Sequence, residues 1–106
     1  MSNTYVTDIT HYLDATGELA EMPGEARQLA SFLALLIDAA TQAFPARNYN
    51  TRIRCRAAAC TGSIRASVAS EDSEILWECP RCGHHGIIRK WQGTKWDQTR
   101  QEGLVG

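Results

Sequence analysis

Residues 79–83 read CPRCG, and this stretch decides the fold. Two cysteines separated by two residues allow one tight turn to present both sulfurs on the same side. Pro80 fixes φ within the turn, and Gly83 can adopt the positive φ that points backbone N–H groups at sulfur. Cys79 and Cys82 therefore predict half of a tetrahedral metal site.

A second pair, Cys55 and Cys60, gives the four cysteines the pattern C-x4-C-x18-C-x2-C. Two close pairs with a medium gap are typical of a four-cysteine zinc site, because two facing turns complete a tetrahedron. The gap within the first pair is wider than in a usual knuckle, although Gly62 can play the backbone role of Gly83. We predict one structural Zn²⁺ bound by Cys55, Cys60, Cys79 and Cys82.

Other uses of the cysteines have less support from the surrounding sequence. A redox C-x-x-C normally opens a helix in a thioredoxin-like βαβ unit, which this sequence does not predict. Disulfides are rare where thiols stay reduced. An iron–sulfur cluster also uses four thiolates, so iron stays an alternative to zinc. An enzymatic or redox role would require reactive thiols at Cys79 and Cys82.

Catalysis is not predicted. Four thiolates fill a tetrahedron, whereas catalytic zinc keeps one position open for water or substrate. His84 and His85 follow the second pair, and we expect them to be surface or hydrogen-bonding residues because the coordination is already complete. His11 is isolated and is expected to be structural or exposed. The sequence has no phosphate-cradling glycine loop and no serine elbow.

The composition is that of an ordinary folded domain. The chain has 106 residues, of which 43% are hydrophobic and 22% are charged, which suits one domain or one small domain with an extension. No apolar run approaches the roughly 20 residues that span a bilayer. The N-terminal MSNTYVTDITHY has no basic start followed by an apolar stretch, so no signal peptide is predicted. We therefore expect a cytoplasmic protein without membrane association.

Pro45 divides the chain into a helical part and a cysteine-bearing part. In residues 1–46, apolar side chains recur at three- and four-residue steps over 25–44, which predicts a long amphipathic helix that Pro45 ends. Residues 5–14 are ambiguous: their Thr and Val residues favour a strand, whereas Val6, Ile9 and Leu13 match helical spacing, and we expect a short helix or turn there. In residues 47–106, segments rich in β-branched and aromatic residues predict strands. These segments are 51–55, 63–69, 74–79 and 86–91.

The predicted fold class is α+β, with an N-terminal helical segment followed by a small antiparallel β zinc ribbon. We expect the apolar face of the helix to pack on the ribbon rather than form a dimer seam, because most such faces serve the core of their own chain. Trp77 and Trp91 flank the second cysteine pair, and we expect them to pack over the metal or against the helix.

The charges are unevenly distributed along the chain. Residues 1–46 carry six acids and one base, residues 47–106 carry ten bases and six acids, and the formal net charge is −1. An excess of bases in the cysteine-bearing part favours an anionic partner, and the near-zero total favours internal pairing of the two halves.

Two groups of basic residues are candidate nucleic-acid contacts. Arg52, Arg54 and Arg56 alternate in a strand-like segment, so their side chains would project on one face and form a basic stripe suited to phosphates. The second group contains Arg89, Lys90, Lys95 and Trp96. This group could combine phosphate binding with base stacking. Alternatively, the bases pair with the acidic N-terminal part of the same chain or with a partner.

With CPRCGHHGIIRKWQGTKWD in view, the chain resembles the zinc-ribbon superfamily, and more narrowly short, stand-alone bacterial zinc-ribbon proteins. The resemblance covers Cys55 to Asp97. Members of the superfamily serve in transcription, translation and protein assembly, so the resemblance implies a class of fold and not one function. We predict a non-catalytic, zinc-stabilised binding module that contacts nucleic acid through a basic ribbon face. The alternative is a protein–protein adaptor with a purely structural zinc. The sequence specifies neither the partner nor the oligomeric state.

Overall fold

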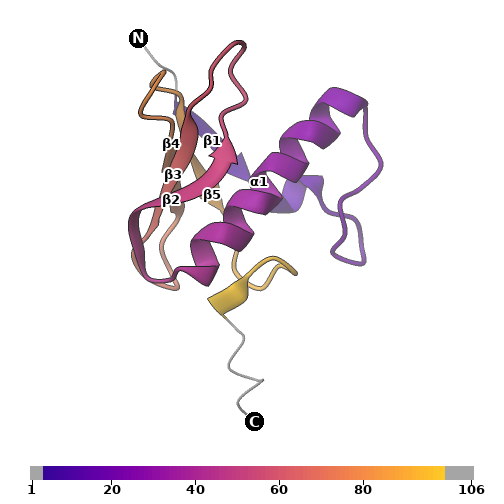
Figure 1. Cartoon of the computed structure of the whole chain (residues 1–106). Helices are drawn as coiled ribbons and strands as arrows, with labels where there is room; N and C mark the ends of the chain where they lie inside the picture. Colours follow the sequence, from indigo (N-terminus) through magenta and orange to yellow (C-terminus); the bar gives the residue numbers. More distant parts are fainter. Residues whose placement is uncertain (1–3, 100–106) are drawn as a thin grey trace.

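The fold is a five-stranded sheet with one long helix across one of its faces (Figure 1). The computed structural model describes residues 4–99. Its elements in chain order are β1 (Thr4–Asp8), the 3-10 helix η1 (Ile9–Tyr12), α1 (Gly24–Gln42), β2 (Ala46–Arg54), β3 (Ser63–Val68), β4 (Ile75–Glu78) and β5 (His85–Arg89). The strands lie in the order β1-β5-β4-β3-β2. Neighbours among β2 to β5 are antiparallel.

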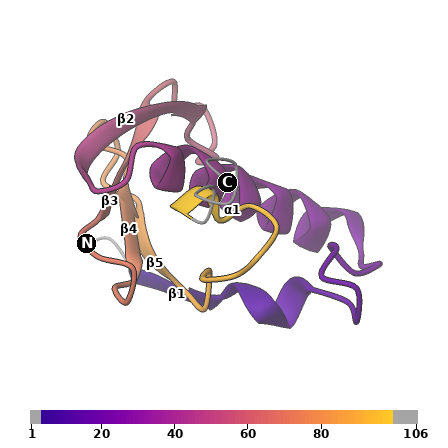
Figure 2. The same cartoon turned by 90° about the horizontal axis from the view of Figure 1, so that it is seen from below.

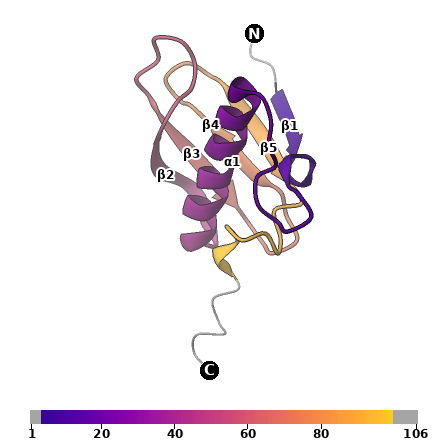
Figure 3. The same ribbon diagram turned by 90° about the vertical axis from the view of Figure 1, so that its right-hand side faces the viewer.

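The helix α1 confirms the predicted amphipathic segment, although it ends at Gln42, two residues earlier than expected. Its apolar side buries Leu33, Leu36 and Ile37 against the sheet. Figures 2 and 3 show the helix lying along one face of the sheet and leaving the other face uncovered. The apolar face of α1 therefore packs within the chain, as the sequence predicted.

The N-terminal strand β1 corrects two predictions. Residues 4–8 form a strand, where a short helix or turn was expected over 5–14, and only Ile9–Tyr12 is helical. This strand pairs with β5 in parallel, with Val6 opposite Ile87. The α+β class is confirmed, but the sheet is mixed and not a purely antiparallel ribbon. Because the partner of β1 lies about 80 residues away in the sequence, local patterns could not reveal the pairing.

One core joins the helix to the cysteine-bearing strands. The fully buried Ile64, Ile75 and Ile88 come from β3, β4 and β5 and pack with the helix residues. Trp91 is also fully buried, and its indole N–H donates to the Ser73 carbonyl at 2.9 Å. The core cluster also includes Cys55 and Cys79, so the cysteine loops are continuous with the rest of the fold.

The sheet has two chemically different ends. Strands β2 and β4 finish, and β3 and β5 begin, at the end that carries the four cysteines. We call this the cysteine end; its loops are residues 55–62 and 79–84. The opposite end, which we call the lysine end, carries residues 69–74 and 90–97, with Lys90 and Lys95. The cysteine end is the upper end of the sheet in Figure 1.

Candidate metal centre

The four cysteines come together in space. Their Sγ atoms all lie within 4.8 Å of one another. Cys55 to Cys82 and Cys60 to Cys79 are both 3.6 Å between sulfurs, and each of these contacts joins one loop to the other. A tetrahedron with Zn–S bonds of about 2.3 Å has S···S edges of about 3.8 Å. The cluster therefore has the size and ligand set for one metal ion, and the chemistry of four thiolates favours zinc.

The two cysteine loops are closed by equivalent backbone hydrogen bonds. The Cys55 N–H donates to the Gly62 carbonyl at 2.9 Å, and the Cys79 N–H donates to the His84 carbonyl at 2.7 Å. Each acceptor lies two residues beyond the second cysteine of its pair. Gly83 adopts the predicted positive φ, +87°. The longer first loop thus reaches the same closure as the tight second loop, despite its two additional residues.

Gly62 directs its N–H at a sulfur as predicted, but without the positive φ of Gly83, and it also has a steric role that the sequence did not suggest. Its N–H lies 3.4 Å from the Cys60 sulfur, as the Ala57 N–H does from the Cys55 sulfur. Such N–H groups favour the thiolate form of the ligand. A Cβ at Gly62 would lie 2.7 Å from the Cys79 sulfur, so the first loop can pass this close to the second only without a side chain there.

Burial and ionisation differ among the four thiols. Cys55 and Cys79 are buried, Cys60 is partly buried and Cys82 is exposed. Burial raises the pKa of Cys55 to about 12. Burial also opposes ionisation of Cys79, but hydrogen bonds from the backbone N–H groups of Cys82 and Arg81 and from the Cys60 and Cys82 thiols together outweigh it and lower its pKa to about 7. A buried thiol such as Cys55 becomes a thiolate at neutral pH only with a cation to replace the proton, and a metal ion supplies that cation.

The histidines lie beside the cluster and outside it. His84 Nδ1 is 3.3 Å from the Cys82 sulfur, and His85 Nδ1 is 3.0 Å from the Gly83 carbonyl oxygen. Both rings therefore make the hydrogen-bonding contacts expected of them. When a ring nitrogen donates to a coordinated thiolate, it helps to orient that ligand.

An aromatic platform adjoins the cluster. The Tyr5 and Trp77 rings are stacked, with centroids 6.4 Å apart and planes 9° apart. In the register of the sheet, Gly86 lies between them, and a Cβ there would lie 2.6 Å from the Trp77 ring. Phe32 of α1 meets Trp77 edge-on at 5.6 Å. Sequence reasoning missed Tyr5, Phe32 and Gly86 as site residues; a glycine inside a strand of β-branched residues was the signal that a close approach occurs there.

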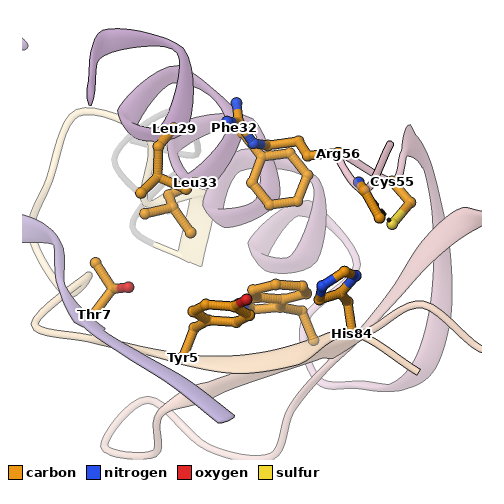
Figure 4. A pocket seen from close by; sticks show the side chains of 10 residues that line it. Tyr5, Thr7, Leu29, Phe32, Leu33, Cys55, Arg56 and His84 are labelled. Atoms are coloured by element: carbon orange, nitrogen blue, oxygen red, sulfur yellow. Dashed lines mark hydrogen bonds between the residues drawn. The ribbon is translucent and has the colours of Figure 1, made fainter. Parts of the chain in front are cut away.

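Between this platform and α1 lies a pocket of about 310 Å³. Leu29, Phe32 and Leu33 of the helix face Tyr5 and His84 across it (Figure 4). Cys55 and Arg56 line the side nearest the metal centre. The Trp77 indole N–H is buried and has no hydrogen-bond acceptor among residues 4–99.

The first group of predicted phosphate contacts lies at and near the cysteine end. Arg52, Arg54 and Arg56 are all exposed, and within the described residues none of them forms an ion pair. The Arg56 guanidinium lies over the Phe32 ring, 5.8 Å from its centroid. The regular alternation that we assumed is interrupted, because Arg52 has a φ of +64° and the pairing register shifts between Asn50 and Arg54.

The second predicted group lies at the lysine end and is not brought together with the first. Arg89 pairs with Glu74, and Lys95 Nζ lies 2.6 Å from a Glu18 carboxylate oxygen. The group also includes the exposed Lys90 and the partly buried Trp96. Trp96 packs against the core, so its ring is part of the scaffold.

The comparisons with known proteins assign no family. No protein-family model, no curated protein and no solved structure matches the chain. The similarity to zinc ribbons therefore rests on the cysteine pattern and on the geometry of the cluster. Among the described residues, no helix has the length and apolar character required to cross a bilayer.

Proposed function

We propose that this protein is a non-catalytic, zinc-stabilised binding module that contacts nucleic-acid phosphates at its cysteine end. One observation carries the proposal: Arg52, Arg54 and Arg56 are exposed and without ion pairs in the described structure, beside a four-cysteine cluster. Arg89 and Lys95, in contrast, already contact carboxylates. Unpaired arginines keep their charge and donors available for phosphates.

The zinc in this proposal is structural. Four thiolates complete its coordination, so the ion offers no position for substrate. Cys79 is fully buried, which hinders attack by or on its sulfur despite its lowered pKa. The metal would hold two loops together and thereby fix Arg54 and Arg56, which flank Cys55.

A specific observation favours a second candidate, a protein–protein adaptor. On the face that α1 leaves uncovered, Val6, Ile87 and Leu76 form one cross-strand row. Val6 is 54% exposed and Leu76 is 50% exposed. An apolar row on an open sheet face suits a protein partner better than a phosphate backbone.

The test is nucleic-acid binding by the zinc-loaded protein, measured by fluorescence anisotropy with random single- and double-stranded oligonucleotides at several salt concentrations. We expect saturable binding that weakens with salt, because each phosphate contact releases counterions. Replacing Arg54 or Arg56 by alanine should reduce the slope of log K against log salt by about 1 for each arginine.

Arg89→Ala is the matched control, since Arg89 is also exposed but is paired with Glu74 at the other end of the sheet. It should leave the slope unchanged. If no oligonucleotide binds at low salt, where electrostatic attraction is strongest, nucleic-acid binding is rejected and the adaptor function takes its place.

A further inference from the structure

We propose that the pocket beside the metal centre accepts one unstacked base of a single-stranded nucleic acid, so that the protein prefers single strands to duplexes. This inference rests on the proposed function and adds the form of nucleic acid that is recognised. It is carried by three properties of the pocket: its size, its aromatic walls and its charge.

The volume of the pocket suits the ring system of one base and not a nucleic-acid duplex. The pocket measures about 310 Å³ and is bounded by α1 on one side and by β1 and β4 on the other. It is therefore at the lower end of the range for small-molecule sites. A base that is paired and stacked in a duplex cannot enter such a space, whereas the bases of a single strand are free to turn out of the chain.

The walls of the pocket contain aromatic rings on which a base could stack. Tyr5 and Trp77 are nearly parallel, and His84 is 5.9 Å from Tyr5 with its plane tilted by 37°. Tyr5 is 48% exposed although it belongs to this aromatic group. Exposed aromatic faces bind bases without strong sequence preference, because every base presents a π surface. The buried Trp77 N–H, which has no acceptor among the described residues, shows that the platform does not satisfy its own polar groups.

The charged side chain at the edge of the pocket favours an anion over a cation. With zinc bound, four thiolates and one Zn²⁺ would leave the centre with a net charge of about −2, which Arg54 and Arg56 beside Cys55 would offset. None of the described residues that line the pocket carries a carboxylate, and Arg56 stands at its edge. An aromatic pocket for an ammonium group would be expected to exclude a guanidinium. A base attached to a phosphate matches both features, since the ring contacts Tyr5 while the phosphate accepts hydrogen bonds from Arg56.

Arginines outside the pocket would also suit a bound nucleic-acid strand. Arg52 and Arg54 lie on the edge strand β2, and Arg56 follows them in the loop at the end of that strand. They would contact neighbouring phosphates of a strand whose base occupies the pocket. Single-strand sites commonly combine a basic track with an aromatic face in this way.

The experiment compares three fluorescent probes on the zinc-loaded full chain: a short mixed-sequence DNA strand, an abasic strand of the same length, and the corresponding duplex. We expect the base-bearing strand to bind most tightly. Tyr5→Ala should weaken its binding by about 5- to 150-fold, the range for loss of one base–aromatic stack. The same substitution should leave binding of the abasic strand and of the duplex unchanged.

Tyr49→Ala is the matched control, because Tyr49 is also an exposed tyrosine on an edge strand, at 43%, and does not line the pocket. It should bind all three probes as the wild type does. Equal binding of the base-bearing and abasic strands, or equal losses in the two tyrosine variants, would overturn the pocket inference while leaving phosphate binding intact. Absence of binding to all three probes at low salt would overturn the proposed function as well.

A measurement without substitutions covers the case in which Tyr5→Ala impairs folding. The indole N–H resonance of Trp77 should shift on addition of the single strand, because a base in the pocket adds a ring current next to it. The indole of Trp91 donates to Ser73 near the lysine end and should not shift. If both resonances or neither of them shift at saturation, the base does not occupy this pocket.

Discussion

The two ends of the sheet hold their loops by different means. At the cysteine end, two loops meet at four sulfurs and a close-packed aromatic group, and their arginines form no ion pair with any described residue. At the lysine end, backbone and hydroxyl hydrogen bonds fix the loops, and Arg89 and Lys95 contact carboxylates. The comparison teaches that basic residues of the same kind can have different consequences: Arg89 and Lys95 already contact carboxylates, whereas Arg52, Arg54 and Arg56 form no ion pair within residues 4–99 and keep their charge for a partner.

The largest expected effect is at the metal centre. Chelation of the metal, or Cys79→Ser, should lower the free energy of unfolding by several kcal/mol, because zinc binding to such sites is itself folding free energy, about 10–16 kcal/mol in zinc-finger peptides. Thermal unfolding followed by circular dichroism, with and without chelator, measures this loss of stability. We expect the cysteine end to lose amide-exchange protection before the lysine end. A native spectrum and an unchanged melting temperature after the metal is stripped would contradict a structural role.

The next effect concerns the close approach of Tyr5 and Trp77 over Gly86. In Gly86→Ala, the new Cβ would lie 2.6 Å from both the indole and the Tyr5 carbonyl oxygen, which belongs to the backbone and cannot rotate away. We expect a loss of about 1–3 kcal/mol in the free energy of unfolding, as for other overpacked sites, measured by urea denaturation. Gly24→Ala is the control, because a Cβ there meets nothing within 4 Å and the residue begins α1. It should be neutral or slightly stabilising. Equal effects of the two substitutions would mean that the contact is not tight.

At the lysine end, a buried hydroxyl should matter to a smaller degree. Thr41 donates to the Ile37 carbonyl at 2.6 Å and accepts from the Gln98 N–H at 2.9 Å, which ties the last described segment to α1. Thr41→Val removes these hydrogen bonds, and the contact with the Trp96 carbonyl, at constant shape, and we expect a loss of about 1–2 kcal/mol by the same denaturation assay. Thr41→Ser keeps the hydroxyl and should retain protection of the Gln98 amide from exchange. If the serine variant loses that protection as the valine variant does, the hydroxyl is not the anchor.

The smallest effect is expected at the ion pair of Lys95 and Glu18. Its side chains are 48% and 57% exposed, and exposed pairs contribute only about 0–1 kcal/mol. Lys95→Ala should therefore change the melting temperature little, and the change should shrink with added salt. A large, salt-insensitive effect would show that Lys95 does more than pair with Glu18, and would weaken the contrast between the two ends.

The helix and most of the strands followed from local patterns. The three- and four-residue spacing of apolar side chains located α1, and β3 and β4 fall within the predicted segments 63–69 and 74–79. Strand β1 did not follow, because its stability comes from pairing with β5, far away in the sequence. The predicted regular alternation of arginines along β2 is also interrupted, because Arg52 has a left-handed backbone conformation.

By itself, the sequence determined which four sulfurs could share one ion, because the spacing of paired cysteines carries that information directly. Gly83 and Gly62 also indicated where the two cysteine loops turn. Only the tertiary structure decided which side chains stand around that centre. Tyr5, Phe32 and Trp77 meet across three elements, and the freedom of an arginine depends on whether an acid from another segment reaches it. Such contacts between distant segments depend on the packing of the whole chain, which no local pattern encodes.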